Sequence, residues 1–209
     1  MEEYLNDKEQ WERVLQWVRE QGPWTVTAVA LVAAAYGGWH YWQGRVDTRY
    51  QAAAGRYEQV VDAFGRNNVD GGLKLADGLI KDYPSSAYAD QANLAAARIQ
   101  VERHELDQAV LRLNQVLGST KDPELALITR MRLARVQLAQ NKPDEALKTL
   151  NAVDPGAFAA RYSQVRGDVL LAKGDRAGAL KEYRAARDGA GETVDTGLLD
   201  LKIGELARS

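Results

Sequence analysis

The chain has 209 residues, with 27 Lys and Arg against 29 Asp and Glu, a formal net charge of -2, and no cysteine. This length accommodates one folded domain plus an appendage. The near balance of charge excludes the basic field of a nucleic-acid-binding protein, and the lack of cysteine excludes disulfides, thiolate zinc sites and cysteine nucleophiles. Alanine is abundant and proline occurs only 5 times, so we expect an all-α fold.

Residues 1–22 form a predicted N-terminal tail that is rich in acidic side chains. Its apolar residues recur at the i, i+3, i+4, i+7 spacing of an amphipathic helix, namely Trp11, Val14, Leu15 and Val18. A helix of this kind can lie on a membrane surface. Gly22 and Pro23 are expected to break that helix where the tail ends.

Residues 23–44 are predicted to form a single transmembrane helix. The stretch carries no formal charge, and at about 1.5 Å per residue its length matches a hydrocarbon core of roughly 30 Å. Aromatic side chains, which favour the headgroup level, stand at both ends: Trp24 at one, and Trp39, Tyr41 and Trp42 at the other. No strong helix breaker follows Gly44, so the span is expected to run directly into the next element.

Two other interpretations of this stretch stay open, a cleaved signal peptide and a core helix of a soluble protein. Ala33, Ala34 and Ala35 fit a cleavage pattern, but the acidic tail and the apolar sequence that continues to Trp42 argue against cleavage. The positive-inside count gives no orientation, because three basic residues stand on each side: Lys8, Arg13 and Arg19 before the span, and Arg45, Arg49 and Arg56 after it.

Within the span, Ala30, Ala34 and Gly38 fall four residues apart on one helix face. Small side chains in this pattern let another transmembrane helix approach closely, which predicts a packing face. The alternative is that alanine and glycine merely fill an apolar helix.

Internal repeats dominate residues 45–209. The clearest copy has Gly167, then Ala179 twelve residues later, Tyr183 and Ala186, which is the tetratricopeptide pattern. Small residues corresponding to Ala179 recur at Gly72, Ala109 and Ala146, with separations of 37, 37 and 33 residues against an ideal of about 34. The spacing predicts an α-solenoid of about four helical hairpins, in which small residues let paired helices cross closely.

A last helix is predicted to cap the open end of the array. Leu198, Leu199, Ile203 and Leu206 form its packing face, and its outer face carries Asp200, Lys202 and Glu205. In repeat proteins a terminal element with a polar outer face keeps the array soluble.

No pattern in the sequence predicts catalysis, a cofactor or a metal. His104, Glu105 and Asp107 lie close together, but the repeat register places them in a turn between helices, where Asp107 could cap the second helix. The Gly-Gly pairs at 37–38 and 71–72 lack the framework of a phosphate-binding loop. We therefore expect a protein that is not an enzyme.

Repeat arrays of this kind bind partners through the concave face, which the first helix of each hairpin forms. In the predicted register that face presents Gln91, Leu94, Arg98, Ile128, Met131, Arg135, Arg161, Gln164 and Asp168. Apolar and arginine side chains together suit an extended or helical protein segment. The alternative is an ordinary solvated face.

The chain resembles the YfgM-like family, the ancillary subunits of the bacterial SecYEG translocon, over nearly its whole length. The specific segments are Gly-Trp-His-Tyr-Trp at 38–42 and Leu-Ala-Arg-Val-Gln at 133–137, and further ones lie at 146–150, 166–167, 173–175 and 201–203. This chain has Gly22 and Pro23 before the predicted span, whereas the family usually has Asn-Gly at this place.

This resemblance implies a single-pass protein of the bacterial inner membrane with a cytoplasmic N-terminus and a periplasmic repeat domain. It also implies that the protein associates with SecYEG and with a membrane-anchored periplasmic chaperone of the PpiD type, and that it assists newly exported, unfolded proteins. Two alternatives remain: a tethered scaffold for another envelope complex that does not contact unfolded proteins, and a regulatory protein whose repeats are cytoplasmic and bind a signalling partner.

Overall fold

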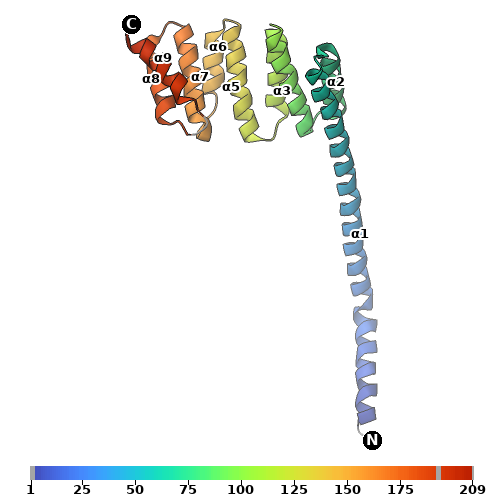
Figure 1. The fold of residues 1–209 in the computed structure, drawn as a ribbon. Helices are drawn as coiled ribbons and strands as arrows, with labels where there is room; N and C mark the ends of the chain where they lie inside the picture. The colour runs from blue at the N-terminus through green and yellow to red at the C-terminus, as the bar shows by residue number, and fades with distance from the viewer. Residues whose placement is uncertain (1–2, 192–193, 209) are drawn as a thin grey trace. The chain divides into compact units, whose positions relative to one another are not determined.

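The structure, a computed structural model, describes residues 3–191 and 194–208. Within these helices the side chains of residues 3–10, 13–23, 25–26, 44 and 46–47 are not described. The chain divides into two compact units, Met1–Gln51 and Ala52–Ser209, each described by itself. Across the described ranges every regular element is a helix (Figure 1), which confirms the predicted all-α class.

The described residues of the first unit all belong to one helix, α1, which runs from Glu3 to Gly65 without interruption. The predicted break at Gly22 and Pro23 is wrong. One proline removes a single backbone hydrogen bond, and the alanine-rich sequence beyond it favours helix. The predicted continuity past Gly44 is confirmed.

Side chains described between residues 27 and 43 are all exposed. They include Val29, Leu31 and Val32, and two ring contacts at the end of the stretch, Tyr36 with His40 and Trp39 with Trp42. In the described part of the chain no helix is both long and apolar enough to cross a membrane. The predicted amphipathic face at Val14, Leu15 and Val18 falls among the side chains that are not described.

The second unit is a solenoid of four helical hairpins and a final helix (Figure 1). The first hairpin joins the end of α1 to α2 (Val69–Asp82), and the second joins α3 (Ala87–Glu102) to α4 (Leu106–Ser119). The third joins α5 (Pro123–Ala139) to α6 (Pro143–Asn151). After the short 3-10 helix η1 (Gly156–Phe158), α7 (Ala159–Ala172) and α8 (Arg176–Asp188) form the fourth, and α9 (Thr196–Arg208) follows. The predicted hairpin count is confirmed.

The small residues that set the repeat register lie where paired helices meet. Ala109, Ala146 and Ala179 are fully buried, and Gly72 is buried as well. A Cβ atom at Gly72 would come within 2.4 Å of the Phe64 ring, so no larger residue fits there without movement. The predicted register is therefore confirmed, and large side chains such as Tyr183 fill the space beside the small ones.

The turn inside each hairpin repeats the same backbone geometry. Asn67, His104, Asn141 and Gly174 all have positive φ, and the residue after each donates its N–H to a carbonyl five residues earlier, as Glu105 does to Gln100 at 2.8 Å. This is the Schellman ending of a helix. His104 is thus a turn residue as predicted, and within the described residues no group of three His, Asp or Glu side chains could hold a metal.

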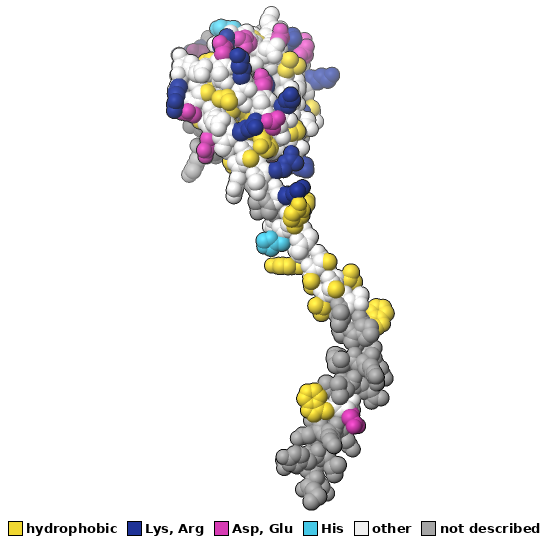
Figure 2. Space-filling view, turned by 90° about the vertical axis from the view of Figure 1, so that its right-hand side faces the viewer, with side chains coloured by type: hydrophobic (Ala, Val, Ile, Leu, Met, Phe, Trp, Pro, Cys, Tyr) yellow, Lys and Arg dark blue, Asp and Glu magenta, His cyan; other side chains and the backbone are white. Residues whose placement is uncertain are grey.

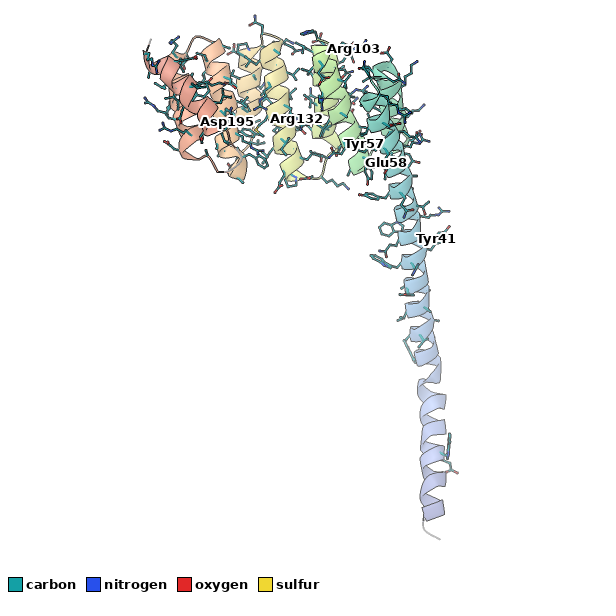
Figure 3. The ribbon with its side chains drawn as sticks, in the orientation of Figure 1. Tyr41, Tyr57, Glu58, Arg103, Arg132 and Asp195 are labelled. Atoms are coloured by element: carbon teal, nitrogen blue, oxygen red, sulfur yellow. The ribbon has the colours of Figure 1, made fainter. Side chains whose placement is uncertain are left out.

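Asp107 does not cap α4, contrary to the expectation. Its carboxylate accepts a hydrogen bond from Gln140 at 2.7 Å, in the next repeat. The corresponding contacts join Asp70 to Arg103 at 2.7 Å (Arg103 is labelled in Figure 3) and Asp144 to Lys173 at 2.5 Å. Each of these aspartates stands two residues before the small anchor of its repeat, so the same position makes a polar contact with the following hairpin in all three repeats.

The last helix caps the array as predicted, although its faces differ from the prediction. Leu199 is fully buried against α8, and Ile203 and Leu206 pack beside it. Leu198 is 43% exposed and belongs to the outer face together with Leu201, which is 68% exposed. The reason is helical geometry, because positions 199, 203 and 206 already complete one face and position 198 lies about 100° away.

Candidate partner-binding groove

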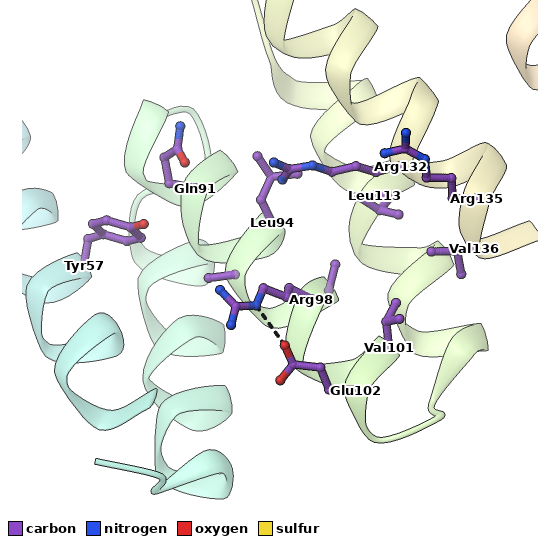
Figure 4. A pocket seen from close by; sticks show the side chains of 12 residues that line it. Tyr57, Gln91, Leu94, Arg98, Val101, Glu102, Leu113, Arg132, Arg135 and Val136 are labelled. Carbon is purple, nitrogen blue, oxygen red and sulfur yellow. Dashed lines mark hydrogen bonds and ion pairs between the residues drawn. The ribbon is translucent and has the colours of Figure 1, made fainter. Parts of the chain in front are cut away.

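A groove of about 570 Å³ lies in the second unit between α3 and α5, the first helices of two successive hairpins (Figure 4). Leu113 of α4 closes part of its floor, and Tyr57 of the first hairpin contributes to one end. The volume falls in the range of about 300–1,000 Å³ that is typical of ligand sites. The residues that line it are Tyr57, Gln91, Leu94, Ala95, Ala97, Arg98, Val101, Glu102, Leu113, Arg132, Arg135 and Val136.

The floor of the groove is a part of the hydrophobic core. Leu94, Leu113 and Val136 belong to one buried cluster, and each is only a few per cent exposed. Leu94 of α3 and Val136 of α5 lie at the edge of that cluster, so both also line the groove. An apolar side chain placed in the groove would therefore contact close-packed aliphatic groups.

The rim of the groove is basic. Three arginines and one glutamate line it, and Arg98 donates a hydrogen bond from Nε to Glu102 at 2.9 Å (dashed in Figure 4). Arg132 and Arg135 stand three residues apart on α5, both exposed, and neither has an ion-pair partner among the described side chains. On the face shown in Figure 2, basic and acidic side chains of the repeat unit are intermixed.

Four of the nine predicted partner-binding residues line the groove: Gln91, Leu94, Arg98 and Arg135. Met131 is 5% exposed and packs in the core with Ala134, and Ile128 is partly buried against the same cluster. Arg132 was missed because the predicted face of α5 was rotated by one residue. The spacing of Arg132 and Arg135, with Val136 next to Arg135, is the sequence pattern from which Arg132 could have been predicted as a groove residue.

Arg161, Gln164 and Asp168 lie on α7 and do not line the groove. The Arg161 guanidinium stands 5.8 Å from the centre of the Phe158 ring. Asp168 accepts a 2.7 Å hydrogen bond from the Tyr183 hydroxyl and contacts the Lys202 ammonium, so it ties α7 to α8 and α9. Burial, and then the contact with Asp168, raise the pKa of Tyr183. Asp168 thus has a structural role that the sequence did not indicate.

In the first unit, Ala30, Ala34 and Gly38 are exposed, and a Cβ added at Gly38 would meet no atom within 4 Å. On the opposite side of this helix lies an apolar hollow, lined by Ala28, Val29, Val32, Ala33 and Tyr36. The small residues therefore leave the helix surface open at these positions.

Comparison with known proteins gives consistent matches. Residues 15–208 match the family described as a tetratricopeptide repeat-like domain. The ancillary SecYEG translocon subunit of Escherichia coli (strain K12) is 30% identical over 207 residues, which cover 99% of this chain and 100% of that protein. The protein of the same name from Neisseria gonorrhoeae is 27% identical over 208 residues, covering 99% and 100%.

Solved structures share the fold. A tetratricopeptide repeat protein from Parabacteroides merdae superposes with a TM-score of 0.60 at 12% identity, covering 76% of this chain and 61% of that one. The MamA RS-1 ArsTM double mutant gives a TM-score of 0.56 at 17% identity, covering 75% and 94%. At these identities the likeness establishes the solenoid fold alone.

Proposed function

The chain belongs to the family of ancillary SecYEG translocon subunits, and on that basis we propose that it is a non-enzymatic, protein-binding subunit associated with the SecYEG translocon at the bacterial inner membrane. The similarity that supports this proposal covers the full length of both proteins, so it includes the N-terminal helix as well as the repeats. The groove between α3 and α5 supplies a surface for a protein partner.

We propose further that residues 23–44 cross the membrane. On this stretch of α1, Val29, Leu31 and Val32 are each about two-thirds exposed. Lipid would cover such side chains, and the aromatic cluster at Trp39 and Trp42 suits the interface between lipid and water. The open face at Ala30, Ala34 and Gly38 would admit a second transmembrane helix.

In this proposal the N-terminal tail is cytoplasmic and the repeat domain is periplasmic, the orientation that the family resemblance implies. The repeat domain would then meet a PpiD-type membrane-anchored chaperone and newly exported, unfolded proteins. Binding to such partners needs a complementary surface and no catalytic group, and the groove between α3 and α5 offers such a surface.

The test is isolation of the full chain, tagged after Ser209, from native membranes after mild crosslinking. We expect the chain to resist carbonate washing and to copurify with SecY. Ala34→Leu combined with Gly38→Leu should lower SecY recovery several-fold, because larger side chains hold packed helices apart, and Ala28→Leu combined with Ala35→Leu serves as a control on the same stretch. Recovery with another envelope complex, without SecY, would contradict the proposal.

A further inference from the structure

The arginines on the two walls of the groove differ in how their charge is balanced. Arg98 on α3 is held by Glu102, four residues on. Arg132 and Arg135 on α5 have no acidic partner in the described part of the chain. Two other arginines of the solenoid are paired between hairpins, Arg103 with Asp70 and Arg112 with Asp77. The α5 wall therefore presents two uncompensated positive charges side by side.

We propose that the groove binds an acidic segment of a partner protein, in which carboxylates meet Arg132 and Arg135 and an apolar side chain enters between them and α3. This inference rests on the proposed function and specifies the chemistry of the ligand. A guanidinium binds a carboxylate through two parallel hydrogen bonds, which makes arginine selective for planar acidic groups. Two arginines one turn apart suit two carboxylates of one segment.

The floor of the groove favours a ligand that carries an apolar side chain as well as carboxylates. Leu94, Leu113 and Val136 are apolar and closely packed, so they offer no hydrogen-bond partner to a polar side chain. A ligand that carried only carboxylates would leave this surface in contact with water and gain nothing from burying it. A ligand that is purely apolar would leave the two arginines without partners.

Position inside a groove also strengthens the charge interaction. The side chain of Arg132 extends from α5 in the direction of Leu94 (Figure 4), along the apolar floor. Next to apolar groups the effective dielectric is lower than in bulk water, so an ion pair there is worth more than one on an open surface. The sign of the charge on the ligand should therefore decide binding.

The test uses the full chain in nanodiscs of zwitterionic lipid and three fluorescein-labelled synthetic octapeptides, followed by fluorescence anisotropy. One peptide alternates glutamate with leucine, one alternates lysine with leucine, and one alternates glutamate with serine. The glutamate–leucine peptide should bind at least about tenfold more tightly than either of the others. Equal binding of the two leucine peptides would overturn the proposal, as would equal binding of the two glutamate peptides.

A matched pair of variants locates the binding. Arg132→Glu with Arg135→Glu should abolish the preference for glutamate–leucine and favour lysine–leucine, and Arg132→Gln with Arg135→Gln should remove the preference without reversing it. Lys181→Glu with Arg184→Glu changes the charge equally on the exposed face of α8 and should leave the preference intact. If the α8 variant has the same effect, the groove is not the site.

Recovery of SecY with the same variants separates this inference from the proposed function. If the peptide preference is absent while SecY still copurifies with the chain, the ligand chemistry is wrong and the association with the translocon stands. If the preference is present while SecY does not copurify, the groove chemistry stands and the proposed function fails.

Discussion

Replacing Ala179 with glutamate should lower the free energy of unfolding by roughly 3–5 kcal/mol. Ala179 is fully buried on α8, in a cluster with Tyr183, Ala186 and Leu199. A carboxylate there would lose its water and find no cation, and its extra volume would force α7 and α8 apart. Urea unfolding of the full chain, followed by circular dichroism, measures the loss.

The control for this variant is Lys181→Glu, which adds the same side chain to the same helix two residues away. Lys181 is exposed, so the change should alter the free energy of unfolding by no more than about 0.5 kcal/mol. If the two variants unfold at the same urea concentration, Ala179 does not lie between helices and the repeat register is wrong.

The second large effect is expected at Gly167, the small residue of α7 that faces α8. A Cβ atom at this position would lie 2.5 Å from the Tyr183 ring. That ring cannot move aside, because it is fully buried and its hydroxyl is bonded to Asp168. Gly167→Leu should therefore destabilise the protein by about 1–3 kcal/mol, in spite of the better helix propensity of leucine.

Gly118→Leu in α4 is the matched control, with the opposite expected sign. Gly118 is an exposed helical glycine with no atom within 4 Å of an added Cβ, so leucine there should stabilise the helix by roughly 0.5–1 kcal/mol. Combining Gly167→Leu with Tyr183→Leu should recover a part of the loss. Destabilisation by both single glycine variants would show that the tight contact with Tyr183 is not the cause.

The sequence predicts the repeat fold well because its main determinants are local. Helix pairs need a small residue where they cross, and the interval from Gly72 to Ala109 and on to Ala146 directly reflects one structural repeat. The turns are equally local, since a residue with positive φ ends each first helix. The contacts of Asp70, Asp107 and Asp144 with the following repeat share that interval, so they too could be predicted from spacing.

The groove is less predictable, because it depends on how neighbouring helices are rotated. A shift of one residue turns a helical side chain by about 100°, which suffices to send Met131 into the core and to bring Arg132 to the groove. For the same reason Leu198 was predicted on the packing face of α9 but lies on its exposed face. Asp168 was misplaced for another reason, since its partner Lys202 lies 34 residues away on a different element.

The most direct test of the proposed binding site is site-specific photocrosslinking in native membranes, with a photoreactive amino acid at position 91 on the groove rim or at position 181 on α8. Both residues are exposed in the structure, so both positions tolerate the probe. We predict that position 91 crosslinks to a protein that copurifies with SecYEG and that position 181 does not. Equal crosslinking of that protein from both positions, or none from position 91 while SecY still copurifies, would contradict the claim that this groove is the binding site.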